Sequence, residues 1–440
     1  MQSILIIGCG YVGLVSAACL SEFGHSVICM DVDKDKIKNL KKGIIPIYEP
    51  GLQELVEKNL KVGRLTFTTD IKKSIEVSKI IFIAVGTPTI NDGSADLTFV
   101  FDVASSIGDN INEYKVVVNK STVPVGTGKK VKDIIDEKIK KRNVNYDFNI
   151  VSNPEFLREG SAVSDFMHPD RIVIGTDSEQ ALSVMKQVYS VLFLNNHPFV
   201  FTKLESAEVI KYASNAFLSV KISFINEIAN ICENVGADIH EVAKAIGLDK
   251  RIGKYFLHSG PGYGGSCFPK DNDALVKTAD QFDCELNVVK AAQKTNKEQK
   301  LRMVKKITNE FKNNIENKTI AVLGLSFKPR TDDMREASSL TIINELLSKG
   351  AKIKVFDPVS MSNAKNYYLK SMDVYYATDE YDAVSNADAL VIITEWNEFR
   401  SLNLEKIKNL MNGKLFFDLR NIYSRDLVES TGFKYIAVGR

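Results

Sequence analysis

The chain has 440 residues, with 57 lysines and arginines against 55 aspartates and glutamates, so its net charge is +2. At about 150 residues per domain, this length predicts about three domains, or two large ones with a linking element. Charged residues at 25% and hydrophobic residues at 44% are typical of folded globular proteins and exclude extended disorder. The balanced charge gives no strong field to attract nucleic acid or an anionic membrane, so we expect neither as a partner.

We expect neither a targeting segment nor a membrane span. It begins Met-Gln-Ser-Ile-Leu-Ile-Ile-Gly, without the basic start and small-residue cleavage site of a signal peptide. No run approaches the roughly 18 apolar residues of a membrane span. We therefore expect a cytoplasmic protein. The histidines are scattered without ligand spacing and no cysteines are spaced Cys-x-x-Cys, which predicts neither a metal site nor a disulfide framework.

The first third of the chain alternates β-rich runs with segments of helical period, and a similar pattern returns near residue 318. We expect strands at 3–7, 26–31, 65–68, 79–85, 115–119 and 148–152, and later at 319–324, 352–357, 389–394 and 414–418. Helices such as 11–23, 33–41 and 335–349 lie between them. Strands alternating with helices predict parallel sheets covered on both faces.

A proline-free stretch at 205–236 separates the two patterns. As one helix it would span on the order of 45 Å. Its apolar residues run nearly all the way round, so we expect it to be largely buried and to include a subunit contact. The predicted fold class is α/β, with two Rossmann-like doubly wound domains joined by a long central helix. The predicted boundaries are 1–204, 205–300 and 301–440.

A glycine motif with an acidic partner predicts dinucleotide binding. Gly8, Gly10 and Gly13 follow a strand and open a helix, and Asp31 ends the next strand. The glycines allow a tight turn, close approach of a pyrophosphate and close helix packing, while the helix N-terminus favours phosphate. Asp31 would bind the ribose hydroxyls and repel a 2′-phosphate, which indicates NAD. Neighbouring lysines leave NADP open, and the alternative is a glycine-rich turn without a ligand.

The second α/β half keeps one glycine, Gly324, and places Lys328, Arg330 and Arg335 after its first strand. That end of an open sheet is where ligands bind, and guanidinium groups grip phosphate oxygens bidentately. The pattern favours a charged phosphate ligand, and the alternative is a solvated basic turn.

The loop at 260–271 carries four glycines in six residues, followed by Cys267. Glycines let a backbone approach a ligand closely, and a thiolate there is a candidate nucleophile if a cation or a helix N-terminus activates it. Asp271 lies about one helical turn on. The alternative is a buried structural cysteine, which is our interpretation of the other five.

Two further groups carry candidate catalytic side chains. Lys211 and Asn215 share one face of the long helix, and the lysine has apolar neighbours that would desolvate its amine. Taken alone, Lys211 is better explained as a side chain that reaches solvent. The loop at 152–160 carries Glu155 and Glu159, four residues apart, which on their own suggest charges at a helix N-terminus.

These motifs, in this order and over nearly the whole chain, resemble the UDP-glucose dehydrogenase family (the UDP-glucose/GDP-mannose dehydrogenases). The resemblance rests on the segments 8–13, 46–52, 120–124, 152–160, 211–215, 264–271 and 327–328. It implies an NAD-binding domain at 1–204, a central helical domain with the cysteine loop at 205–300 and a nucleotide-sugar-binding domain at 301–440. It also implies a homodimer or larger homo-oligomer that feeds polysaccharide biosynthesis.

The implied reaction is oxidation of the C6 alcohol of UDP-glucose to UDP-glucuronate, with two NAD consumed. Cys267 would attack the intermediate aldehyde, and Lys211 would stabilise negative charge on oxygen. The other implied catalytic residues are Asp271, Glu155, Thr122 and Asn215. The implied cofactor contacts are Gly8, Gly10, Tyr11, Val12, Gly13, Asp31, Lys36, Thr87, Thr122, Glu159 and Arg335. The implied substrate contacts are Glu155, Phe156, Leu157, Lys211, Asn215, Arg251, Tyr255, His258, Gly264, Phe327, Lys328 and Arg420.

Three other functions remain open at this stage. Relatives that act on GDP-mannose or UDP-N-acetylhexosamines share the cysteine and both nucleotide domains. A two-electron dehydrogenase of small hydroxy acids shares the first half, but it leaves the cysteine loop unexplained. A catalytically silent nucleotide-sugar sensor would lack the cysteine or the lysine, and this sequence has both.

Overall fold

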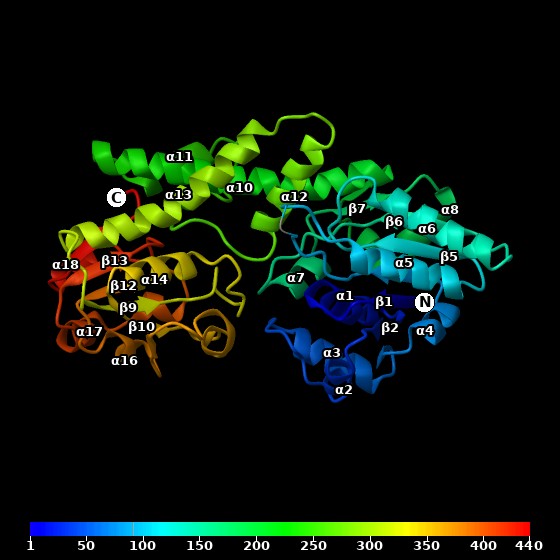
Figure 1. Ribbon diagram of the computed structural model, residues 1–440, viewed down its shortest axis with the longest axis horizontal. Helices are drawn as coiled ribbons and strands as arrows, with labels where there is room; N and C mark the ends of the chain where they lie inside the picture. Colours follow the sequence, from blue (N-terminus) through cyan, green and yellow to red (C-terminus); the bar gives the residue numbers. More distant parts are fainter. Residues whose placement is uncertain (91) are drawn as a thin grey trace. The chain divides into compact units, whose positions relative to one another are not determined.

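The computed structural model describes residues 1–90 and 92–440, which form two compact units (Figure 1). The first unit comprises residues 1–214 and 273–284, and the second comprises 215–272 and 285–440. The predicted boundaries at 204/205 and 300/301 stay a prediction.

The first unit is built on an eight-stranded sheet in the order β3-β2-β1-β4-β5-β6-β7-β8. Its strands are β1 (Ser3–Ile7), β2 (Ser26–Met30), β3 (Leu65–Thr68), β4 (Ile80–Ile83), β5 (Lys115–Asn119), β6 (Phe148–Ser152), β7 (Ile172–Gly175) and β8 (Phe199–Thr202). All pairs are parallel except β6 with β7. The six strands predicted for this part are confirmed, and β7 and β8 were not predicted.

Helices and hydrophobic side chains cover both faces of this sheet. The helices are α1 (Tyr11–Glu22), α2 (Lys34–Leu40), α3 (Leu52–Lys61), α4 (Ile71–Val77), α5 (Thr98–Asn110), α6 (Thr127–Lys141), α7 (Ala162–Met167), α8 (Glu179–Val188) and α9 (Ser190–Leu194). One buried cluster contains Ile4 and Ile6 of β1 and the other contains Leu5 and Ile7. Alternate residues of a strand point to opposite faces, so the uninterrupted apolar run of β1 serves both cores.

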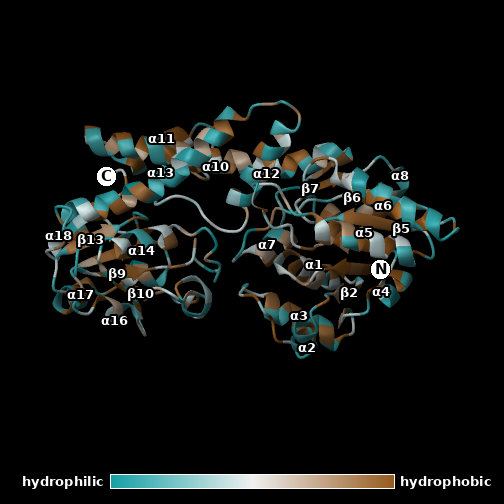
Figure 2. Cartoon of the chain, in the orientation of Figure 1, coloured by the Kyte–Doolittle hydropathy of each residue, from teal (hydrophilic) through white to brown (hydrophobic). Residues whose placement is uncertain are grey.

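The second unit contains a six-stranded parallel sheet in the order β11-β10-β9-β12-β13-β14. Its strands are β9 (Thr319–Leu323), β10 (Lys352–Phe356), β11 (Val374–Tyr376), β12 (Ala389–Ile392), β13 (Leu415–Asp418) and β14 (Lys434–Ala437). The central strands β9 and β12 are apolar and almost fully buried, and Figure 2 colours β9 as hydrophobic. The four predicted strands are confirmed, and β11 and β14 were not predicted.

Its helices are α11 (Ile239–Gly247), α13 (Asn287–Glu310), α14 (Ser338–Ser348), α15 (Met361–Asn363), η1 (Ala364–Tyr368), α16 (Glu380–Val384), η2 (Glu398–Ser401), α17 (Leu404–Leu410) and α18 (Arg425–Ser430). The prediction that a helix begins at Arg335 was wrong, since α14 begins at Ser338. Glu336 has a φ of +51°, in the left-handed region, which the first turn of a right-handed helix does not allow.

Two helices contribute to both units: α10 (Leu204–Val235) and α12 (Phe268–Asp280). The long helix predicted at 205–236 is therefore confirmed. The expectation that it is largely buried is wrong for one face within a single chain. Phe217, Phe224 and Ile231, seven residues apart, are 64%, 49% and 56% exposed. Among the residues that the structure describes, no helix is long and apolar enough to cross a membrane.

Candidate active site

The turn after β1 has the shape that its glycines require. Gly8 has a φ of +108°, and a Cβ atom there would lie 2.5 Å from the carbonyl oxygen of Ala84. A Cβ on Gly13 would lie 1.9 Å from the carbonyl oxygen of Gly8, whereas a Cβ on Gly10 would meet nothing within 4 Å. The turn is thus closely packed at Gly8 and Gly13, whereas there is free space beside Gly10. Because α1 begins at Tyr11 without a side-chain cap, the open side presents backbone N–H groups suited to phosphate.

Asp31 follows β2 beside this turn. Its Oδ2 accepts hydrogen bonds from the backbone N–H of Cys9 and from the Lys36 ammonium, both at 2.9 Å. Burial opposes ionisation of Asp31, but the bonds from Lys36 and from backbone N–H groups hold its pKa below the usual range. The carboxylate is therefore charged and placed to accept from hydroxyl groups. Lys36 neutralises part of that charge. Lys36 and Asp31, both predicted as cofactor contacts, therefore lie side by side.

The loops after β4 and β5 meet at the same edge of the sheet. The hydroxyl of Thr87 donates to the carbonyl oxygen of Thr122 at 2.9 Å, and that of Ser121 donates to the carbonyl oxygen of Val85 at 2.7 Å. The strand order changes direction between β1 and β4, and such a switch point is where open α/β sheets bind ligands. The structure thus brings Thr87 and Thr122 together beside the glycine turn.

Glu49 connects three of the sequence motifs and was not predicted as a site residue. Its buried carboxylate accepts hydrogen bonds from the hydroxyl of Tyr11 and from the backbone N–H groups of Gly160, at 2.7 Å, and Val163, at 3.3 Å. It therefore ties the first turn of α1 to the end of the loop that carries Glu159. Glu49 lies in the segment 46–52, which contributes to the family resemblance but gave no prediction of a site residue.

Glu155 and Lys211 form a buried ion pair. Lys211 Nζ lies 2.9 Å from Glu155 Oε1, and the two residues are only 3% and 7% exposed. Burial opposes the charge on Glu155, yet the Lys211 ammonium keeps the Glu155 pKa below its usual range. The suggestion that Glu155 and Glu159 are helix N-terminal charges is wrong, because α7 begins only at Ala162. The suggestion that Lys211 reaches solvent is wrong as well.

Aromatic and cationic side chains surround this pair. The ring of Phe156 has the Arg171 guanidinium 3.5 Å and the Lys211 ammonium 5.5 Å from its centroid. The next residue, Leu157, is partly buried, and its backbone N–H donates to Glu155 Oε2 at 2.6 Å. The three predicted substrate contacts of this loop therefore lie around one ion pair.

A second buried amine, Lys120, was missed by the sequence prediction. It is 5% exposed and donates to Asn153 Oδ1 at 3.1 Å, an oxygen that also accepts from the hydroxyl of Tyr189 at 2.6 Å. Burial lowers the pKa of Lys120 to about 8, and the nearby Lys211 charge adds to this while Glu155 opposes it. Lys120 is the first residue of the motif 120–124, so the sequence could have marked it as a candidate. Nothing in the local sequence predicts that its side chain is buried.

In the second unit, Cys267 stands immediately before α12. The backbone N–H of Asp271 donates to the Cys267 carbonyl oxygen at 2.8 Å, which is the first hydrogen bond of that helix. The thiol is therefore at the positive end of a helix dipole, one of the two conditions that the sequence analysis set for a nucleophilic thiolate. The Ser266 hydroxyl lies 3.5 Å from the sulfur.

Asp271 and Asn215 are joined directly. Asp271 is 1% exposed; its Oδ2 accepts from the Asn215 amide at 2.6 Å and its Oδ1 accepts from the Lys270 ammonium at 2.7 Å. These two hydrogen bonds fix the orientation of the buried carboxylate. It is suited to orient a water molecule or to accept a proton from it.

The cysteine loop packs against the first turn of the second sheet. A Cβ on Gly264 would lie 2.3 Å from the Glu336 carbonyl oxygen, and one on Gly265 would lie 2.8 Å from the ring of Phe327. The guanidinium of Arg420 donates to the Phe327 carbonyl oxygen at 3.2 Å. The Lys328 ammonium lies 5.2 Å from the centre of the Phe327 ring. The predicted contacts Gly264, Phe327, Lys328 and Arg420 are thus gathered in one place.

Comparison with known proteins gives the family. The chain matches the models of the UDP-glucose/GDP-mannose dehydrogenase family in its NAD binding domain (residues 2–193), its central domain (205–298) and its UDP binding domain (321–425). It belongs to the UDP-glucose/GDP-mannose dehydrogenase family. The chain is accordingly an NAD-dependent oxidoreductase, and the glycine turn with Asp31 fits this cofactor.

Relatives in this family are similar over their full length. The UDP-glucose 6-dehydrogenase of Rhizobium meliloti (strain 1021) is 51% identical, covering 100% of both chains. The UDP-glucose 6-dehydrogenase TuaD of Bacillus subtilis (strain 168) is 48% identical, covering 100% of this chain and 94% of the relative. A solved UDP-glucose dehydrogenase from Pyrobaculum islandicum has a TM-score of 0.88 at 37% identity, covering 96% of this chain and 95% of that one.

Four predicted family contacts lie at the surface or are paired locally. Tyr255 is 70% exposed and His258 is also exposed. The side chain of Arg251 is 89% exposed and forms a bidentate ion pair with Asp249, and that of Arg335 is 56% exposed and pairs with Asp333. Arg335 nevertheless borders the cysteine loop through its backbone, since its carbonyl oxygen accepts the N–H of Gly265 at 2.8 Å.

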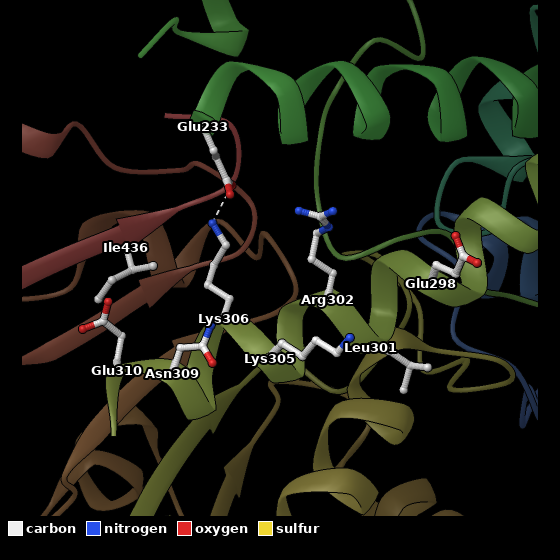
Figure 3. A pocket seen from close by; sticks show the side chains of 9 residues that line it. All are labelled: Glu233, Glu298, Leu301, Arg302, Lys305, Lys306, Asn309, Glu310 and Ile436. Carbon is white, nitrogen blue, oxygen red and sulfur yellow. Dashed lines mark hydrogen bonds and ion pairs between the residues drawn. The ribbon is translucent and has the colours of Figure 1, made fainter. Parts of the chain in front are cut away.

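A cavity of about 730 Å³ in the second unit contains none of the predicted residues (Figure 3). It lies between the end of α10, α13 and β14. Its lining residues are Glu233, Glu298, Leu301, Arg302, Lys305, Lys306, Asn309, Glu310 and Ile436. The three acidic and three basic side chains balance, and Lys306 is paired with Glu233 at 2.5 Å. The cavity therefore has no excess charge that would select an ionic ligand.

Proposed function

We propose that this chain is a UDP-glucose 6-dehydrogenase that oxidises the C6 alcohol of UDP-glucose to a carboxylate. The observation that carries the proposal is the cysteine at the start of α12, one turn from a buried aspartate that is hydrogen bonded to Asn215. The full-length relatives named UDP-glucose 6-dehydrogenase support the choice of substrate. Bound NAD supplies the hydride acceptor, twice for each sugar.

The buried Lys211–Glu155 pair serves the first oxidation. As the alcohol loses its proton and a hydride, negative charge develops on its oxygen, and an ammonium in a water-poor site stabilises that charge. Glu155, 2.9 Å from the amine, is placed to take up or return the proton. Thr122 and its loop assist at the cofactor side.

Cys267 serves the second oxidation. Its sulfur forms a bond to the aldehyde carbon, and the former carbonyl oxygen takes a proton and becomes a hydroxyl. Loss of a hydride and of that proton leaves a thioester. Water then adds to the thioester carbon, the carbon–sulfur bond breaks, and the carboxylate and the thiol are released. Asp271, held by Asn215 and Lys270, acts as the base for this water.

The remaining predicted residues bind the nucleotide sugar and assemble the subunits. We assign the pyrophosphate and sugar to Gly264, Phe327, Lys328 and Arg420. The exposed apolar face of α10 favours a homodimer or larger homo-oligomer, because large side chains seven residues apart form a continuous stripe on a helix. In such an assembly Arg251 would reach a neighbouring subunit's site. A fully active monomer in light scattering would contradict this assembly.

The test is the stoichiometry of NADH per sugar together with the mass of the product. We expect two NADH and UDP-glucuronate from the intact enzyme. The variant Cys267→Ala should bind NAD and form no acid. One NADH per sugar, or a stable ketone, would contradict the covalent step. Initial rates with UDP-glucose, GDP-mannose and UDP-N-acetylmannosamine decide the substrate, and a higher rate with either alternative would overturn our assignment.

A further inference from the structure

Helix α6 lacks a cap of its own. It begins at Thr127, and the preceding Gly126 has a φ of +88° and no side chain that could accept a hydrogen bond. The first N–H groups of a helix have no acceptor within the helix and need one from elsewhere.

A carboxylate from α10 supplies the acceptor. Glu208 Oε2 accepts the backbone N–H of Gly126 at 2.7 Å, and Oε1 accepts that of Gly128 at 2.8 Å. Glu208 is only 3% exposed. A Cβ on Gly128 would lie 3.3 Å from Oε1, so glycine at that position permits the close approach. Both carboxylate oxygens are therefore used, and the charge lies at the positive end of the α6 dipole.

The segment that ends at this cap is the loop that carries Thr122. At its other end, β5 leads into Lys120, whose amine is held by Asn153. In between, the Thr122 carbonyl oxygen accepts from Thr87. The loop at 120–126 is thus fixed at its start by a buried amine and at its end by Glu208.

Glu208 lies three residues before Lys211, so the two side chains leave neighbouring positions on one face of α10. Lys211 is bonded to Glu155, in the loop after β6. The first part of α10 therefore holds the loop after β5 through Glu208 and the loop after β6 through Lys211.

We propose that Glu208 is a positioning residue for the dehydrogenase reaction: its carboxylate fixes the loop at 120–126, and with it Thr122, relative to Lys211. The expected effect on kcat rests on the proposed function, whereas the expected effect on the loop does not. An amide has one acceptor oxygen where the carboxylate has two, and alanine has none. The loop should therefore loosen in the order wild type, Glu208→Gln, Glu208→Ala.

The first experiment compares kcat and KM of these variants with UDP-glucose and NAD⁺. Measurements at about pH 8.5 keep Glu208 ionised, since burial raises its pKa to about 7. Because a displaced group can cost up to about a hundredfold in rate, we expect kcat to fall about tenfold in Glu208→Gln and more in Glu208→Ala, with KM for UDP-glucose within about twofold of wild type. The exposed Glu205, one turn earlier on α10, gives the control Glu205→Gln, which should equal wild type.

A double-mutant cycle with Thr122→Ala separates positioning from a general loss of stability. If Glu208 acts through Thr122, the combined loss in kcat should be clearly smaller than the product of the two single losses. A fully multiplicative combination would overturn the proposal. If Glu208→Gln does not fold, Gly128→Ala, which crowds Oε1, replaces it in the cycle.

Hydrogen exchange tests the same inference without substrate. In Glu208→Gln the backbone amides of residues 120–128 should exchange faster than in wild type, while those of β1 keep their protection. Unchanged exchange at 120–128 would refute the role of Glu208. A wild-type protein that forms no NADH from UDP-glucose would instead refute the proposed substrate, and the exchange result would stand apart from it.

Discussion

Asp31 and Asp357 occupy the same position in the two sheets, directly after the second strand, but they are used differently. Asp357 is 1% exposed, and its oxygens accept from the backbone N–H groups of Leu325 and Ser360 and from the Trp396 indole. Asp31 has fewer partners, and its side chain is 11% exposed. Only the first of these acids has lone pairs left for ribose hydroxyls, which agrees with a dinucleotide in the first unit.

Replacing Asp31 by Asn should change cofactor preference. The amide keeps one acceptor for the Cys9 N–H but loses the charge that repels a 2′-phosphate and strengthens hydrogen bonds from ribose. We expect KM for NAD⁺ to rise about tenfold and the preference for NAD⁺ over NADP⁺ to fall by at least as much. Steady-state rates with both cofactors measure this. The exposed neighbour Asp35→Asn should leave both values unchanged, and an unaltered preference in Asp31→Asn would exclude the assigned role.

Lys120 should make stability depend on pH in the alkaline range. Its pKa is about 8 in the native state, against 10.5 ordinarily, so between these values the unfolded chain binds a proton that the native chain does not. The free energy of unfolding therefore gains on the order of 3 kcal/mol from this group as pH rises through that window. Urea titrations should show this gain in wild type relative to Lys120→Met. If the difference in free energy of unfolding between the two proteins did not change with pH, the lowered pKa of Lys120 would be contradicted.

The elements that the sequence predicted well are those with a strong local pattern. The apolar strands and the long proline-free helix could be recognised from their own residues, without knowledge of the elements that they pack against. The strands β8, β11 and β14 were missed because they lie at sheet edges and carry no continuous buried apolar run, and β7 comes where the sheet reverses to an antiparallel pair. The start of α14 was placed three residues early, because a left-handed residue at Glu336 leaves no trace in apolar spacing.

The glycine turn and α1 allow two substitutions of the same size to be compared. A methyl group at Gly13 would meet the Gly8 carbonyl oxygen at 1.9 Å, so Gly13→Ala must push α1 away from β1 and should cost about 3 kcal/mol or more. Gly10 has open space and an ordinary φ of −78°, so Gly10→Ala should melt as wild type does but bind NAD poorly. Thermal melting and NAD titration distinguish the two. Equal melting temperatures for both variants would contradict this account.

At the scale of the whole chain, the missed site residues share one property: their partners are far away in sequence. Glu49 binds Gly160, 111 residues on, and Glu208 binds Gly128, 80 residues back. No local spacing marks such a side chain, whereas Cys267 and the glycines stand in short motifs that can be recognised directly. The sequence therefore predicted the groups proposed for the chemistry better than the carboxylates that hold their loops in place.

Arg251 provides a test of the assembly. Its exposed side chain leads us to expect that it completes a neighbouring subunit's site, so Arg251→Ala and Cys267→Ala should each be inactive alone. When the two are dissociated together and reassembled, half of the dimers should be mixed. Each mixed dimer has one site with both residues intact, which predicts about a quarter of wild-type activity. If Arg251 acted within its own subunit, every site would lack one group and mixing would restore no activity.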